Sequence, residues 1–323
     1  MYDRSFAERF VSDNLLSQKN ARRPFLVGSD WWDDCDDVLA MKLFTFAANE
    51  GIIDLRGVAL NALKENSVAS LCAFLENGGL SPRIGADFSG IDYGGYGLYQ
   101  ARMAPFAEKY KKNEDAEDGV RLYRSVLAAA EDHTVELCEI GFPTLLCGLL
   151  KSGADDLSPF GGVELVRQKV KKLWYMAGDW RSDGAKENNF SRVPQIYAAS
   201  ETVLKLFPCE ITFLGLEIGL PVISGACLAG KDTFTAHALA DAHHADGRNS
   251  WDPMTALLAL CGDEEKAGYS VTRGKARVDG ATGKNYFSRS EDGKHAYVTA
   301  LHEPSFYSSV IDFLLAPCGE RSP

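Results

Sequence analysis

The chain has 323 residues, of which 46% are hydrophobic and 24% charged, and its formal net charge is −11. This composition is ordinary for a globular protein with an ample core, and the length suits one large domain or two smaller ones. The acidic balance disfavours nucleic acid and anionic membrane surfaces as partners, because both call for a basic patch. No apolar run is long enough to span a bilayer, and the first residues lack the layout of a secretory signal. We therefore expect a cytoplasmic protein.

Short apolar runs recur along the chain, with helical patterns between them. A run at residues 25–28 predicts a first buried strand, and the residues from 38 to 44 have helical periodicity. The later predicted strands cover residues 55–60, 83–86, 135–140, 172–176 and 211–216. Further helices are predicted at residues 67–75, 120–130 and 202–206. This alternation predicts an α/β fold with a Rossmann-like, mainly parallel sheet covered by helices on both faces.

No linker divides the chain, so residues 1–323 are expected to form a single domain. Residues 1–23 have a helical pattern and are expected to form an N-terminal extension. Residues 266–297 are polar and Gly-rich, and are expected to form a small peripheral irregular or β region. The eight cysteines include no Cys-x-x-Cys pair, which indicates reduced core thiols and argues against a disulfide framework or a zinc site.

The most unusual segment is the acidic turn, residues 29–37, which directly follows the first predicted strand. It places five carboxylates within eight positions, namely Asp30, Asp33, Asp34, Asp36 and Asp37. Helix capping accounts for one or two of them, and an EF-hand is excluded because the central Gly and distal Glu are missing. Their mutual repulsion favours a bound hard divalent cation with oxygen ligands. In a parallel sheet, ligands bind beyond the carboxyl ends of the strands, where this turn is expected to lie.

Six segments follow one another in order between about residue 25 and residue 260. They are the acidic turn, Val58–Asn61, Gly85–Asp87, Gly141–Leu146, Glu187–Phe190 and Ser250–Pro253. Together they resemble the motifs of the inosine-uridine-type nucleoside hydrolases. The resemblance implies calcium-dependent hydrolysis of the N-glycosidic bond of ribonucleosides or related ribosides. It also implies a small-molecule substrate and a homo-oligomer, either a dimer or a tetramer.

The resemblance also implies roles for individual residues. The calcium ligands it implies are Asp30, Asp37, the Thr144 carbonyl and Asp252. Asp30 would in addition act as the general base toward a metal-activated water. Recognition of the ribose would involve Asp36, Asn61, Glu187 and Asn189.

The chain departs from the family pattern at two places that matter for chemistry. Gly28 stands where the family has an Asp, and Trp251 stands where many members have a His that can protonate the leaving base. His244 is a candidate replacement for that proton donor. Trp251 and the adjacent pair Trp31 and Trp32 are candidates for the wall of the base pocket, although one of the pair is expected to pack the turn instead.

Two other functions remain open from the sequence. A non-catalytic riboside-binding protein would keep the metal site and lose turnover, and Trp251 is its best support. A magnesium-dependent phosphohydrolase is less favoured, because no Gly-rich phosphate loop or basic cluster accompanies the acids. The roles of Asp33, Asp34 and Glu217 are unassigned.

Overall fold

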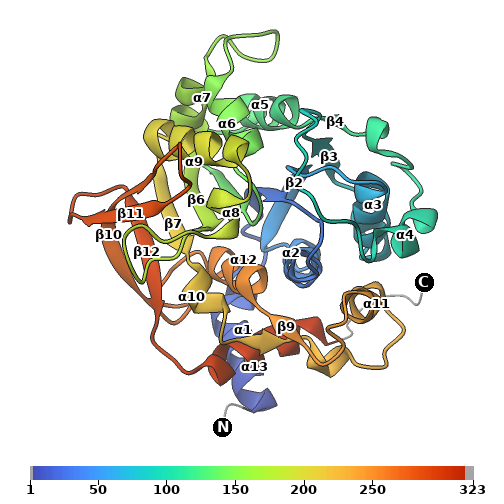
Figure 1. The fold of residues 1–323 in the computed structure, drawn as a ribbon. Coiled ribbons are helices and arrows are strands. Elements are labelled where there is room, and N and C mark those ends of the chain that lie inside the picture. The colour runs from blue at the N-terminus through green and yellow to red at the C-terminus, as the bar shows by residue number, and fades with distance from the viewer. Residues whose placement is uncertain (1–2, 317–323) are drawn as a thin grey trace.

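A ten-stranded sheet runs through the middle of the molecule in this computed structural model, which describes residues 3–316 (Figure 1). From one edge to the other its strands are β11 (Asn285–Arg289), β10 (Tyr269–Val278), β12 (His295–Ala300), β7 (Glu210–Leu214), β6 (Val170–Met176), β5 (Val135–Glu139), β1 (Arg23–Ser29), β2 (Ile53–Leu60), β3 (Arg83–Ala86) and β4 (Glu117–Asp118). Every neighbouring pair from β12 to β4 is parallel, whereas β10 pairs antiparallel with both β11 and β12. A separate antiparallel pair is formed by β8 (Ile223–Ser224) and β9 (Arg248–Asn249).

Helices cover both faces of the sheet. One face packs against α1 (Arg4–Asn14), α2 (Asp36–Asn49), α3 (Ser67–Asn77), α11 (Phe234–Asp241), α12 (Trp251–Cys261) and α13 (Pro304–Leu315). The other face packs against α5 (Gly119–Ala129), α6 (Thr144–Lys151), α7 (Gly162–Lys169) and α9 (Pro194–Leu206). Three one-turn helices complete the set: α4 (Gln100–Met103), α8 (Asn188–Ser191) and α10 (Leu216–Gly219).

The central strand β1 shows why a separate hydrophobic core lies on each face of the sheet. Phe25 and Val27 pack into the core under α2 and α12, whereas Leu26 packs into the core under α5 and α6. Successive side chains of a strand point to opposite faces, so a continuous apolar run is what a strand buried on both faces requires. The predicted fold class, an α/β domain with a large, mainly parallel sheet between helices, is confirmed.

Two segments differ in detail from their predictions. Residues 266–297 contain β10, β11 and the start of β12, which extend the main sheet because β12 pairs in parallel with β7. The predicted helix at 202–206 is only the end of α9, which begins at Pro194. Residues 1–23 contain α1, whose Phe6 and Phe10 rings lie 5.0 Å and 5.5 Å from the Phe306 ring of α13.

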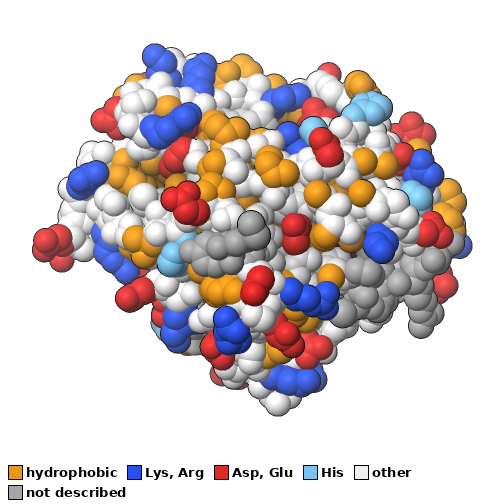
Figure 2. Space-filling view, turned by 90° about the horizontal axis from the view of Figure 1, so that it is seen from below, with side chains coloured by type: hydrophobic (Ala, Val, Ile, Leu, Met, Phe, Trp, Pro, Cys, Tyr) orange, Lys and Arg blue, Asp and Glu red, His pale blue; other side chains and the backbone are white. Residues whose placement is uncertain are grey.

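Three expectations drawn from the composition can be compared with the structure. None of the helices in the described part of the chain is long and apolar enough to cross a membrane. On the face shown in Figure 2, acidic and basic side chains are interspersed and not sorted by sign. The seven cysteines among residues 3–316 are all free thiols.

Candidate active site

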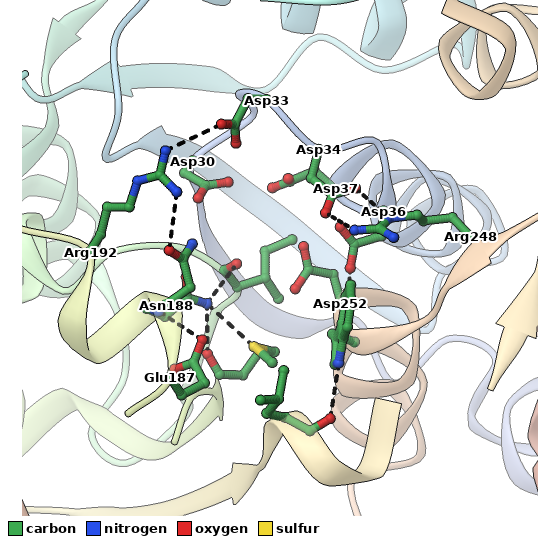
Figure 3. Close-up of a pocket in the computed structure, with 15 residues that line it drawn as sticks. Asp30, Asp33, Asp34, Asp36, Asp37, Glu187, Asn188, Arg192, Arg248 and Asp252 are labelled. Atoms are coloured by element: carbon green, nitrogen blue, oxygen red, sulfur yellow. Dashed lines mark hydrogen bonds and ion pairs between the residues drawn. The ribbon is translucent and has the colours of Figure 1, made fainter. Parts of the chain in front are cut away.

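A cavity of about 240 Å³ opens at the carboxyl ends of the central strands (Figure 3). Its walls come from the acidic turn after β1, the residues after β5, the end of β6, the segment around α8, and the starts of α10 and α12. The lining residues are Asp30, Asp33, Asp34, Asp36, Asp37, Ile140, Met176, Glu187, Asn188, Asn189, Arg192, Leu216, Arg248, Trp251 and Asp252. The acidic turn therefore lies where the parallel sheet was expected to place it.

Three buried carboxylates on one side of the cavity form a cluster that could hold a metal ion. Asp36 and Asp37 open α2, Asp252 lies in the first turn of α12, and one oxygen from each lies within 4.8 Å of the others. The backbone N–H of Asp252 donates to Asp36 Oδ2 at 3.2 Å, which joins the starts of the two helices. We call these three residues the acidic triad.

Burial dominates the electrostatics of the acidic triad. It raises the pKa of Asp36 and Asp252 well above the ordinary value, and repulsion from neighbouring Asp carboxylates adds to the effect. Burial also raises the pKa of Asp37 to about 6, against hydrogen bonds from Ser29 and Asp30 that lower it. A divalent cation with oxygen ligands would remove this desolvation and repulsion penalty, so the donor set fits such an ion.

Asp30 lines the same cavity beside the acidic triad. Its pKa is raised well above the ordinary value by burial and next by Asp37, with which it shares a hydrogen bond. The backbone around it is tightly packed, because a Cβ at Gly141 would lie 2.5 Å from the Asp30 nitrogen. The resemblance implied that Asp30 is a metal ligand and that Asp36 binds the sugar. In the structure Asp36 belongs to the acidic triad, and Asp30 lies next to it.

Two of the residues predicted to recognise ribose form the opposite wall. Glu187 caps α8, accepting from Asn189 N at 2.7 Å and from Gly178 N at 2.9 Å, and burial raises its pKa to about 7. The side-chain amide of Asn189 donates to the Met176 carbonyl at 2.9 Å. Both side chains are thereby held rigidly at the cavity wall.

Asn61 and Thr144, in contrast, are not among the residues lining the cavity. The Asn61 amide donates to Glu139 Oε1 at 2.7 Å and its oxygen accepts from Phe142 N at 2.8 Å. Both ends of this side chain are therefore occupied in fastening the loop after β5. Thr144 begins α6 behind that loop, and its hydroxyl lies 3.5 Å from the Asn61 carbonyl.

The adjacent tryptophans Trp31 and Trp32 pack the acidic turn into the protein and are not among the lining residues. They are 0% and 1% exposed. Trp31 adopts a left-handed φ of 42° and donates its indole N–H to Ser70 Oγ at 2.9 Å. Trp32 packs against Tyr93 and Phe142. Of the three tryptophans proposed for the base pocket, Trp251 alone contributes to its lining.

Two arginines that sequence analysis did not single out flank the cavity mouth (Figure 3). Arg192 lies 3.4 Å from Asp33, with its guanidinium carbon 4.5 Å from the centroid of the Trp32 ring. Arg248 binds Asp34 with two hydrogen bonds, of 2.8 Å and 2.6 Å. Asp33 and Asp34, which had no assigned role, therefore anchor the acidic turn to distant parts of the chain. No motif in the sequence pointed to these pairs.

Glu139 is a further buried residue that sequence analysis missed. It is the register partner of Gly28 on the neighbouring strand, and a Cβ on Gly28 would overlap its carboxylate. Glu139 Oε1 accepts from Asn61 and from Gly141 N, and burial raises the pKa of this carboxyl to about 8. Gly28, noted above as a departure from the family pattern, makes room for this acid on the next strand.

We expect Gly28→Ala to lower the free energy of unfolding by about 1–3 kcal/mol, because its methyl group would overpack the site against Glu139. In a Glu139→Ala background the same change should cost much less, because the obstructing carboxylate is gone. Urea unfolding of the four proteins in this double-mutant cycle measures the difference. An equal cost of Gly28→Ala in both backgrounds would show that Glu139 is not what excludes a side chain at position 28.

Comparison with known proteins shows similarity at the level of structure alone. No family model matches the chain, and no curated protein matches its sequence. A purine-preferring ribonucleoside hydrolase from Gardnerella vaginalis superimposes with a TM-score of 0.68 at 15% identity, over 90% of this chain and 98% of the other. A plant nucleoside hydrolase gives 0.66 at 14% identity, over 92% and 100%. The inosine-uridine preferring nucleoside hydrolase from Bacillus anthracis gives 0.65 at 16%, over 90% and 99%. The protein thus has the nucleoside hydrolase fold.

Proposed function

We propose that the protein is a metal-dependent N-ribosyl hydrolase that cleaves the N-glycosidic bond of ribonucleosides or related ribosides. The observation that carries this proposal is the convergence, around one cavity, of the acidic triad, Asp30 and the Glu187–Asn189 wall. The fold shared with nucleoside hydrolases supports it. We further propose that the ion is calcium, because carboxylate-rich oxygen sites of flexible geometry suit it.

Each of these residues has a separate role in the proposed mechanism. A divalent ion held by the acidic triad would lower the pKa of a water directed at C1′. Asp30 accepts the proton that this water loses on attack. Glu187 and Asn189 bind ribose hydroxyls, and the surrounding carboxylates stabilise the positive charge that develops on the sugar as the C1′–N bond breaks.

Release of reducing sugar tests the proposal directly. With calcium present, we expect ribose to be released from at least part of a panel of purine and pyrimidine nucleosides and p-nitrophenyl riboside. The nitrophenyl compound belongs in the panel because its leaving group departs without a proton. Calorimetric binding of ribosides without hydrolysis of any of them would instead support the non-catalytic riboside-binding protein.

Two further expectations stay predictions. They are cytoplasmic localisation, which was expected from the sequence itself, and assembly into a dimer or tetramer, which the resemblance implies. A magnesium phosphohydrolase gains no support from the site, because the two arginines that line it are already engaged by Asp33 and Asp34.

A further inference from the structure

The cavity lacks a histidine that could protonate a leaving base. All six histidines fall within the described residues 3–316, and none of them lines the cavity. His244, the candidate donor, lies in the turn after α11. Trp251 occupies the wall instead, and its indole N–H donates to the Leu216 carbonyl at 2.9 Å.

The other polar side chains of the lining do not replace the missing histidine. A guanidinium group is too weak an acid to give a proton to a leaving base, so Arg192 and Arg248 do not take this role. Asp33 and Asp34 each accept from one of these guanidinium groups. Glu187 accepts from the backbone N–H of Asn189 with one carboxylate oxygen and from that of Gly178 with the other, so both of its oxygens are engaged as acceptors. A neutral purine or pyrimidine therefore has to leave this site without a dedicated acid, which is slow because its anion is a poor leaving group.

The charge of the cavity favours a different kind of leaving base. Seven carboxyl groups line it, against two guanidinium groups that are each turned onto a carboxylate. With a divalent ion in the acidic triad, the seven carboxyl groups still outnumber the four positive charges of the ion and the two guanidinium groups. A low-dielectric cleft lined by one sign of charge concentrates ligands of the opposite sign.

We propose that the preferred substrates are N-ribosides whose base already carries a positive charge, such as pyridinium ribosides. This inference rests on the proposed hydrolase function. When the C1′–N bond breaks, its electron pair goes to the ring nitrogen and neutralises the pyridinium, so the base leaves as a neutral molecule. The water oxygen bonds to C1′ and its proton goes to Asp30, so no proton has to be supplied to the leaving group.

Three substrates separate the two parts of this inference. Nicotinamide riboside is cationic and leaves without a proton, p-nitrophenyl riboside is neutral and leaves without a proton, and inosine is neutral and needs one. We expect kcat for the first two to exceed that for inosine by about 10²-fold or more, the scale of a missing general acid. Only nicotinamide riboside should show a KM that rises with added NaCl, because salt screens its attraction to the cavity.

Each other outcome has a definite meaning. A kcat/KM for inosine equal to that for nicotinamide riboside would overturn the inference. Fast cleavage of p-nitrophenyl riboside together with slow cleavage of nicotinamide riboside would overturn the preference for positive charge. If none of the three is cleaved, the proposed hydrolase function itself fails.

Two variants sharpen the test. Trp251→His places an ionisable ring at the cavity wall, and we expect it to raise the ratio of kcat for inosine to kcat for nicotinamide riboside by about tenfold or more. Asp33→Asn removes one negative charge, and should raise the KM for nicotinamide riboside relative to that for p-nitrophenyl riboside. Asp13→Asn, an exposed change of the same type on α1, should alter neither ratio. Unchanged ratios in both cavity variants would overturn the inference.

Discussion

Asp30→Asn is expected to lower kcat for riboside hydrolysis by about 10³-fold, within the range that a general base contributes. The amide keeps the shape of the carboxyl group but cannot accept the proton of the attacking water. The KM should change much less, because the sugar contacts proposed for Glu187 and Asn189 remain. Initial rates of reducing-sugar release with the best substrate of the panel measure both parameters.

Stability provides the control for Asp30→Asn. In the metal-free protein, burial and Asp37 favour the protonated form of Asp30, which shares a hydrogen bond with Asp37. An amide can donate in the same place, so the metal-free melting temperature should not fall. The matched variant Asp13→Asn, which removes an exposed carboxylate of α1 that does not line the cavity, should keep full activity. Full activity of Asp30→Asn would show that another group is the base.

Calcium is expected to raise the melting temperature by about 5 °C when present at about 100 times its dissociation constant, because binding to the folded state then contributes about 2.7 kcal/mol. Asp252→Asn should abolish this shift. Without metal, the same substitution should leave the protein as stable as the parent or more stable, because it removes a buried carboxyl whose ionisation is costly. The variant should therefore be less stable than the parent with calcium but no less stable without it, and differential scanning fluorimetry with and without EDTA measures both differences.

The pH dependence of the metal-free protein has a definite sign. The acidic triad, Asp30 and Glu187 have raised pKa values in the folded state, so between the unfolded and folded pKa values the folded state binds more protons. Stability should therefore fall as the pH rises from about 4 through the folded pKa of Asp37 at about 6 and beyond. The calcium shift should grow over the same interval, since the ion binds the ionised carboxylates. A larger shift with magnesium than with calcium would contradict the choice of ion.

The acidic turn shows which parts of the site could be predicted from the sequence. Five carboxylates in one turn after a buried apolar run indicated a cation site beyond the carboxyl end of a strand in a parallel sheet, and the cavity lies there. Asp37 and Asp252 were paired as ligands across more than 200 residues only through the resemblance. The sequence could not show that Asp36, and not Asp30, belongs to the acidic triad. Which carboxylate meets Asp252 depends on the direction in which α2 leaves the turn.

Other parts of the site were out of reach for the same reason. Asn61 was proposed to bind ribose, but its amide is held by Glu139 and Phe142 on a strand and loop that are neighbours only in the folded sheet. Trp31 and Trp32 have the flat aromatic side chains expected of a base-binding wall, but in the structure they pack into the hydrophobic core.

By itself the sequence determined the features that depend on neighbours in the chain: the apolar runs that became β1, β2, β3, β5, β6 and β7, and the acidic turn, whose mutual repulsion predicted a cation site. Only the tertiary structure decided which partners those groups meet. Asp33 pairs with Arg192, which is 159 positions away, and Asp34 pairs with Arg248, which is 214 positions away. The Glu139 side chain fills the space beside Gly28 on the adjacent strand. The physical reason is that periodicity and charge density are local properties, whereas strand register and helix packing join residues whose separation along the chain carries no signal.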